Sequence, residues 1–139
     1  MSKILITDII CIMKLSAYHI LRISMAITFL WIGVLILQQP EAWGGYLQPW
    51  AADLLPISLK LAMILAGVMD ILVGVFLLIN VWVWHAAILG ALHLALMLVV
   101  SGINAITVRD IGLLGGAFAL AFHAWPDNLR FWIKQNNRL

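Results

Sequence analysis

One long apolar run with a single acidic residue near its middle constrains the fold more than any other feature. Residues 57–79 form this run, and Asp70 is its acidic residue. A helix of that length crosses the hydrocarbon core of a bilayer. An ionisable side chain at that depth is costly in lipid, so it should face protein or water. Met63, Gly67 and Gly74 share its helical face and allow close approach of another helix. We therefore expect Asp70 to lie inside a helix bundle.

The composition places the whole chain in a membrane. Of its 139 residues, 65% are hydrophobic and only 10% are charged, which is far from the balance of a soluble domain. Four spanning helices use about 80 to 90 residues. Short loops and two tails then remain, without room for a soluble catalytic domain. We expect a single membrane domain over residues 1–139.

Apolar segments bounded by glycine, proline and interfacial aromatic residues predict four transmembrane helices. Their expected ranges are 17–38, 57–79, 81–103 and 107–125. Residues 3–15 carry too many charges to form a transmembrane helix, and residues 127–138 are amphipathic. Both segments should therefore lie at the membrane surface. Residues 39–56 are rich in proline, glycine and tryptophan, which predicts an interfacial loop over one end of the bundle. The predicted class is an all-α integral membrane four-helix bundle with interfacial N- and C-terminal segments.

The distribution of basic residues predicts the orientation in the membrane. Six of the eight Lys and Arg residues lie in or beside the two tails: Lys3, Lys14, Arg22, Arg130, Lys134 and Arg138. The positive-inside rule then puts both termini in the cytoplasm, in a bacterial-type cytoplasmic (inner) membrane. Because the basic residues are scattered rather than gathered in a patch, no nucleic-acid partner is expected. The expected surroundings are the lipid bilayer and a membrane or membrane-associated protein partner, or further copies of the chain.

Arg22 and His93 are the polar residues expected to accompany Asp70. Arg22 can reach the membrane surface or turn inward to a carboxylate. An ion pair between Arg22 and Asp70 has two interpretations. It can be a structural contact that fixes how the two helices align, or it can control proton transfer by Asp70. His93 lies near mid-depth of the third predicted helix, on an inward face that it shares with Ala86, Gly90 and Met97. There it can hydrogen-bond a quinone carbonyl, exchange a proton with Asp70, or simply bond a neighbouring helix.

The fourth predicted helix begins with a charged pair. Arg109 and Asp110 are expected at its outer end, either as solvated boundary residues or as a site for an anion that a guanidinium can bind. The face expected to pack in the bundle consists of Arg109, Gly112, Gly116, Ala119 and His123. Gly112 and Gly116 form a GxxxG pair, which permits tight contact between helices.

The histidines and the cysteine show no pattern of a metal site. No two of His19, His85 and His123 are three or four residues apart, the spacing that places two ligands on one helical face. Cys11 is the one cysteine, which excludes an internal disulfide, a CxxC redox pair and a cysteine-ligated iron–sulfur cluster within the chain. We predict no metal site, and any electron chemistry then needs a quinone, another cofactor or a partner.

Three motifs in order resemble the DoxX/DoxD-like family of small four-helix membrane proteins. They are Arg22 with the segment 29–33, the segment 66–78 around Asp70, and the segment 109–115. Asp70 stands where family members often have glutamate, and the lysine that commonly follows the first-helix glycine is absent after Gly33. The resemblance implies association with membrane oxidoreductase systems, including thiosulfate:quinone oxidoreduction and oxidative-stress complexes. It also permits a sulfur oxyanion as the anion at the fourth helix.

The leading hypothesis is a subunit of a quinone-linked membrane oxidoreductase system, without a complete redox centre of its own. Asp70, His93 and Arg22 are the candidate proton and quinone site, and Arg109 and Asp110 are the candidate substrate-binding residues. A quinone is the candidate cofactor. Two alternatives stay open, which are a non-catalytic docking or assembly subunit of a larger membrane complex and a small-solute transporter.

Overall fold

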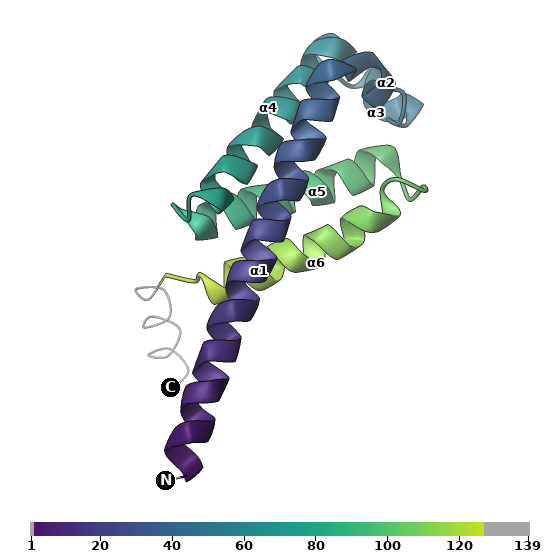
Figure 1. Cartoon of the computed structure of the whole chain (residues 1–139). Helices are drawn as coiled ribbons and strands as arrows, with labels where there is room; N and C mark the ends of the chain where they lie inside the picture. The colour runs from purple at the N-terminus through teal and green to yellow at the C-terminus, as the bar shows by residue number, and fades with distance from the viewer. Residues whose placement is uncertain (1, 127–139) are drawn as a thin grey trace, which may run out of the picture.

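Helices make up all the regular structure in the part of the chain that is described. The computed structural model describes the backbone of residues 2–126 and the side chains of residue 13 and residues 16–126. The helices in this part are α1 (Ser2–Gln38), α2 (Pro40–Gly44), α3 (Pro49–Asp53), α4 (Leu59–Leu78), α5 (Val83–Ser101) and α6 (Val108–His123). Figure 1 shows the four long helices and the two short ones between α1 and α4. The predicted all-α class is confirmed.

Three helices are long and apolar enough to cross a membrane. They are the Ser16–Gln38 part of α1, the whole of α4 and the whole of α5, and they coincide with the first three predicted spans. The chain is therefore an integral membrane protein. Helix α6 has 16 residues, which gives a length of about 24 Å. It is shorter than the hydrocarbon core of about 30 Å and does not belong to this set.

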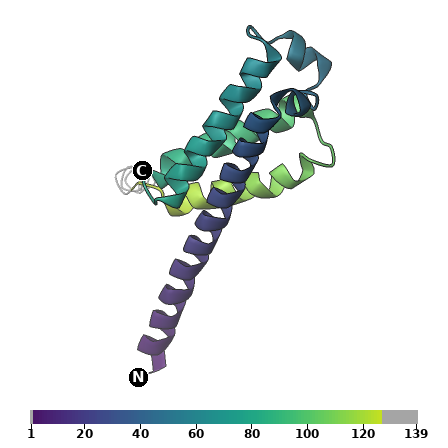
Figure 2. The same cartoon turned by 45° about the horizontal axis from the view of Figure 1, so that its top comes forward.

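Helix α1 differs from the prediction at its start. Residues 3–15 were expected to form a separate interfacial segment, but α1 is one continuous helix over Ser2–Gln38, and its purple end runs well past the other helices in Figures 1 and 2. The physical reason is that the chain has no glycine or proline before Gly33, so nothing in its sequence breaks the helix. The predicted amphipathic tail, 127–138, lies outside the described residues.

Helices α1 and α4 lie side by side and touch at their backbones (Figure 1). A Cβ atom added at Gly33 would lie 2.7 Å from the carbonyl oxygen of Gly67, and one added at Gly67 would lie 3.0 Å from that of Gly33. Gly74 has equally little room, since its Cβ would lie 2.9 Å from the backbone nitrogen of Leu30. The predicted inward face of α4, with Asp70 between Gly67 and Gly74, is confirmed as buried.

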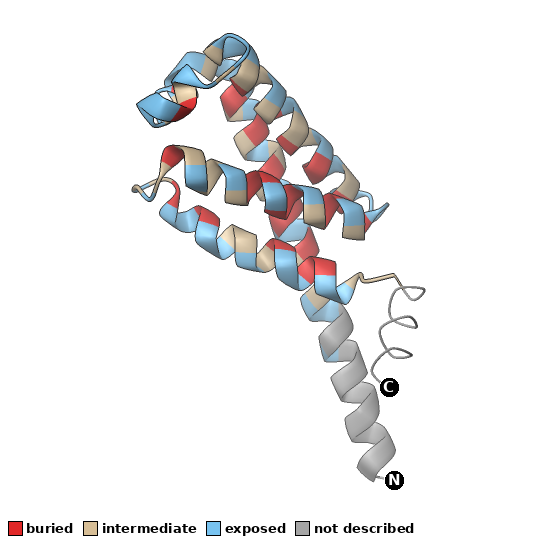
Figure 3. Cartoon of the chain, turned by 180° about the vertical axis from the view of Figure 1, so that it is seen from behind, coloured by how far each residue is buried: buried red, intermediate tan, exposed pale blue. Residues whose placement is uncertain are grey.

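Helices α5 and α6 form a second pair, which crosses the first (Figures 1 and 2). The turn from α4 into α5 is very short and places Asn80 and Trp82 at positive φ, 60° and 48°. Figure 3 shows the buried residues along the faces where the helices meet, with intermediate and exposed residues on the outward faces. The buried face of α5 includes Ala86, Gly90 and His93, as the sequence predicts.

Helix α6 presents a different face from the predicted one. Its buried residues are Asp110, Ala117, Leu120 and Ala121, whereas the predicted face was Arg109, Gly112, Gly116, Ala119 and His123. Within the described residues, no atom lies within 4 Å of a Cβ added at Gly112, whereas a Cβ added at Gly116 would lie 3.1 Å from the Met25 sulfur of α1. In the described part of the chain, only the second glycine of the predicted GxxxG pair therefore makes a close contact. Small residues occur on every side of this helix, and their spacing therefore does not distinguish its faces.

The segment 39–56 contains two short helices, where the sequence predicted only a loop. Pro40 and Pro49 stand in the first turns of α2 and α3, where a missing backbone N–H does no harm. The segment is attached to the end of α5 through Gln48, whose backbone N–H donates to the Val100 carbonyl at 2.9 Å and whose Nε2 donates to the Ser101 carbonyl at 3.3 Å. It therefore lies over one end of the helices.

We predict that Gly33→Ala destabilises the protein in detergent by about 1–3 kcal/mol, because the new methyl group overlaps the backbone of α4. The measurement is the thermal unfolding midpoint in a mild detergent. Gly112→Ala is the matched control, since its methyl group meets nothing within the described residues and a helical alanine is more stable than glycine by about 1 kcal/mol. Equal midpoints for the two variants would contradict the described packing of α1 on α4.

Candidate functional site

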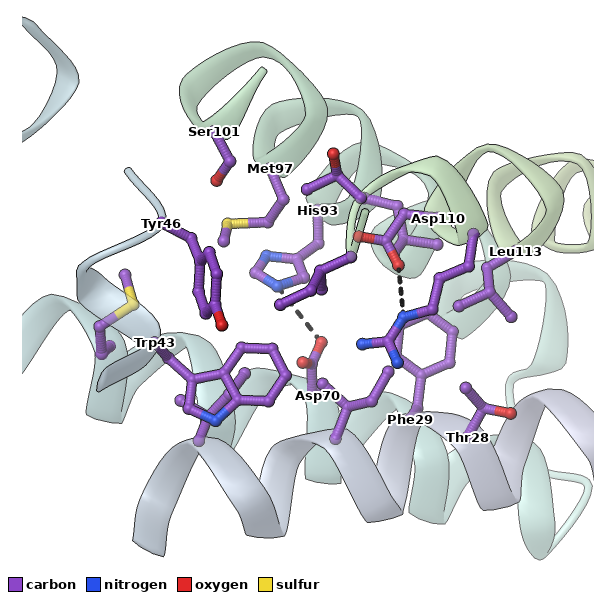
Figure 4. A pocket seen from close by; sticks show the side chains of 17 residues that line it. Thr28, Phe29, Trp43, Tyr46, Asp70, His93, Met97, Ser101, Asp110 and Leu113 are labelled. Atoms are coloured by element: carbon purple, nitrogen blue, oxygen red, sulfur yellow. Dashed lines mark ion pairs between the residues drawn. The ribbon is translucent and has the colours of Figure 1, made fainter. Parts of the chain in front are cut away.

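The centre of the site is a contact between Asp70 of α4 and His93 of α5. His93 Nε2 lies 3.3 Å from Asp70 Oδ1, and the two side chains are only 7% and 5% exposed. Figure 4 shows the two side chains pointing toward each other across the pocket. The sequence analysis placed both residues in one candidate site, and in the structure they are in contact.

The carboxylate of Asp70 is not fully satisfied by its neighbours. Its Oδ1 atom is buried and makes no hydrogen bond with the described residues, although the His93 ring is within ion-pair distance. A buried polar atom without a hydrogen bond is unfavourable, and such atoms are rare unless water, an ion or a ligand supplies the missing bond. Asp70 can therefore accept a hydrogen bond from a molecule that enters the site when it is ionised, and donate one when it is protonated.

Asp70 and His93 line a pocket with a volume of about 50 Å³. A single water molecule needs about 10–15 Å³ by this measure, so the pocket admits a few waters or one small polar group. Arg109 and Asp110 also line it, and most of the remaining wall is apolar. The apolar and aromatic lining residues are Phe29, Ile32, Ile36, Trp43, Tyr46, Met63, Leu94, Met97, Ile106 and Leu113 (Figure 4).

Arg109 and Asp110 form the charged end of the pocket. Arg109 Nε lies 3.6 Å from Asp110 Oδ1, and the side chain of Arg109 is half exposed while that of Asp110 is 12% exposed. Asp110 lies in the first turn of α6, where the helix dipole favours a negative charge. The sequence placed this pair apart from Asp70. The structure brings them to one pocket because the α5–α6 pair crosses α4.

Arg22 does not reach Asp70, which corrects the predicted pair. Its Nη1 donates to the backbone carbonyls of Leu77 and Leu78, the second at 2.9 Å. Leu77 lies two turns beyond Asp70, about 10 Å along the helix. The guanidinium therefore sits at the C-terminal end of α4, where unpaired carbonyls and the helix dipole attract a cation. Arg22 does not line the pocket.

Trp43 and Tyr46 are pocket residues that the sequence did not indicate. The sequence predicts an interfacial loop for the segment that carries them, and the structure shows that both side chains line the pocket next to Asp70 and His93 (Figure 4). Their ring centroids are 6.2 Å apart in an edge-to-face arrangement. The segment that carries them has no helical periodicity, and no residue pattern shows which way its aromatic side chains point.

The fold and the pocket define an integral membrane protein of the all-helical kind, with a buried polar site between its membrane-capable helices. The DoxX family model matches residues 17–102. The chain therefore belongs to the DoxX family. No curated protein and no solved structure matches it. The matched range includes Asp70 and His93, while Arg109 and Asp110 lie beyond it.

We predict that Asp70 is energetically coupled to His93 and not to Arg22. In a double-mutant cycle, Asp70→Asn with His93→Gln should show a coupling of about 0.5–3 kcal/mol, as expected for side chains in contact. Asp70→Asn with Arg22→Gln should be additive within about 0.5 kcal/mol. Both cycles are read from denaturant unfolding in the same detergent. A larger coupling to Arg22 than to His93 would contradict the contacts described above.

Proposed function

We propose that this DoxX-family protein is a membrane subunit of a quinone-linked oxidoreductase system, and that the pocket receives part of the quinone ring. The observation that carries the proposal is the buried Asp70 carboxylate, which has an unpaired oxygen beside the His93 imidazole. A quinone ring is flat and apolar, and its carbonyl oxygens need hydrogen-bond donors and, on reduction, protons. Apolar walls with a few convergent polar groups are typical of sites for such molecules.

Asp70 and His93 divide the proton chemistry in this proposal. Reduction of a quinone to a quinol takes two electrons and two protons. His93 donates a hydrogen bond and then a proton to a quinone carbonyl from one ring nitrogen, while Asp70 in its protonated form returns a proton to the other, Nε2, so that the imidazole stays neutral. Water entering the pocket then restores the proton of Asp70, and the same relay supplies the second proton. The electrons come from a redox centre on a partner oxidoreductase, since the chain has a single cysteine and no cysteine-ligated iron–sulfur cluster of its own.

Arg109 and Asp110 form the substrate end of the same site in this proposal. The half-exposed guanidinium of Arg109 can bind an anion such as a sulfur oxyanion at the mouth of the pocket. Asp110 orients Arg109 through their contact. Arg22 is assigned a positioning role only, because its Nη1 donates to the carbonyls of Leu77 and Leu78 at the end of α4 and the residue does not line the pocket.

We further propose four spans, with α6 as the fourth and both termini in the cytoplasm of a bacterial-type inner membrane. The start of the membrane-capable part of α1 and the end of α6 lie at the same end of the molecule, where Tyr18 stacks on His123, and an even number of crossings requires this arrangement. The basic residues near the tails support a cytoplasmic location for that end. A span shorter than the bilayer core is accommodated by local thinning of the bilayer.

The topology predicts the results of reporter fusions. A cytoplasmic fluorescent reporter fused after Leu139 should be active, and a periplasmic enzyme reporter inserted between α2 and α3 should be active as well. The two reporters exchanged between these positions serve as controls and should be silent. An active periplasmic reporter after Leu139 would mean an odd number of crossings and would contradict α6 as a span.

Replacement of Asp70 tests the proton role directly. Asp70→Asn keeps the size of the side chain but removes its acid–base chemistry, so quinone-dependent turnover of the purified assembly should fall about 100-fold. Asp53→Asn, at an exposed carboxylate of α3, is the matched control and should leave turnover unchanged. Unchanged turnover in Asp70→Asn, with the assembly intact, would contradict the proposal.

Isolation of the native protein in mild detergent, followed by mass spectrometry, separates the proposed subunit from its alternatives. A bound quinone together with an oxidoreductase partner supports the proposal. A protein partner without quinone would instead indicate a docking or assembly subunit. A monomer with neither would contradict both functions and direct attention to solute transport, which liposome flux dependent on Asp70 would then establish.

A further inference from the structure

A second cavity lies against the polar pocket, on the membrane-facing side of α4 and α5. It is a groove between α3, α4 and α5 with a volume of about 430 Å³. Of the residues that line it, His93 is polar and all the others are apolar. We refer to it as the α3–α5 groove. Its size and composition suit a hydrocarbon chain and not a charged substrate.

The α3–α5 groove and the polar pocket share part of their walls. Met63, His93 and Met97 line both cavities. His93 thus contacts Asp70 on one side and borders apolar space on the other. Methionine side chains are unbranched and flexible, so the two that complete the shared wall can move to connect the cavities.

The groove opens sideways toward the lipid. Trp50 and Leu54 of the segment after α2 are 50% and 73% exposed, and Leu65 of α4 and Leu96 of α5 are 55% and 57% exposed. All four line the groove. A chain lying in it therefore remains in contact with the hydrocarbon of the bilayer along its length.

The opposite side of the polar pocket is less suitable for a hydrocarbon chain. There the pocket is bordered by Arg109, whose charged side chain is half exposed. A hydrocarbon chain that left the pocket on this side would pass a guanidinium group and strip water from it, which is unfavourable. The apolar groove offers a path without that penalty.

We propose that the α3–α5 groove holds the isoprenoid tail of a membrane quinone, and that one carbonyl end of its ring enters the polar pocket at Asp70 and His93. This inference rests on the function proposed above and adds the position of the tail. The tail is as well solvated by lipid as by the groove, so burial of the tail adds little affinity. The groove contributes to binding because it provides space for the tail. When the ring contacts His93, the tail must extend into apolar surroundings, and the groove is the apolar space next to His93.

The position of the tail is tested first on the unaltered protein in lipid nanodiscs. The probe is a quinone with a photoreactive diazirine in its hydrocarbon tail, and the labelled peptides are identified by mass spectrometry. We expect labels concentrated on residues 47–55, 62–69 and 96–100, suppressed by an excess of unlabelled tailed quinone. Labels on the α1 and α6 side, at Thr28 or Leu113, would overturn the inference, as would uniform labelling of all lipid-facing residues.

A groove-filling variant tests the same point by binding. Ala66 lines the groove, so Ala66→Phe should weaken binding of a tailed quinone at least tenfold, while binding of the matching tail-less quinone stays within twofold. The affinity of each quinone for a variant is compared with its own affinity for the unaltered protein. Its partition into lipid is the same in both measurements and therefore does not affect the ratio. Val68→Phe is the matched control, because Val68 lies on the same helix, is 43% exposed and lines neither cavity.

The outcomes separate this inference from the function on which it rests. If both quinones bind the unaltered protein and Ala66→Phe affects them equally, the tail position is wrong and the quinone function stands. If neither quinone binds the unaltered protein, both are wrong. Should Ala66→Phe fail to fold, the photolabelling result decides the tail position by itself.

Discussion

The contact between the backbones of α1 and α4 is the constraint on which the site depends. Apolar side chains of a membrane helix gain little by leaving lipid for protein, so association depends on close packing. Gly33 and Gly67 provide that packing, and Gly74 provides a second close contact about two helical turns further along α4. Asp70 lies between the two glycine contacts of α4. Rotation of α4 about its axis is thereby fixed, and the carboxylate is directed toward α5 and away from lipid.

Much of the arrangement within single helices was predictable from the sequence. Helical periodicity and small residues identified the buried faces of α4 and α5, and with them Asp70 and His93. The all-α class and three of the membrane-capable helices followed from length and composition. These features depend on residues close together in the chain, which is why a sequence reveals them.

Features that depend on how helices cross were not predictable. The partners of Arg22 are backbone carbonyls at the end of α4, and carbonyls occur at every residue, so no sequence pattern marks them. The charged pair at the start of α6 reaches the pocket because one helix pair crosses the other, and crossing geometry is not encoded in the periodicity of either helix. Trp43 and Tyr46 lie in a segment with an irregular path, and their rings face the pocket because this segment packs on α4 and α1 and is hydrogen-bonded to the end of α5.

Arg22 also fixes the end of α4 from which the chain enters α5. It holds α1 to the last carbonyls of α4, immediately before the short turn into α5, and Tyr18 of α1 donates a hydrogen bond to Asn80 within that turn. At the opposite end, Gln48 of the segment between α1 and α4 is hydrogen-bonded to the last turn of α5. The two helix pairs are therefore tied to each other at both ends, so the angle at which they cross, which sets the width of the pocket between them, is fixed from both sides.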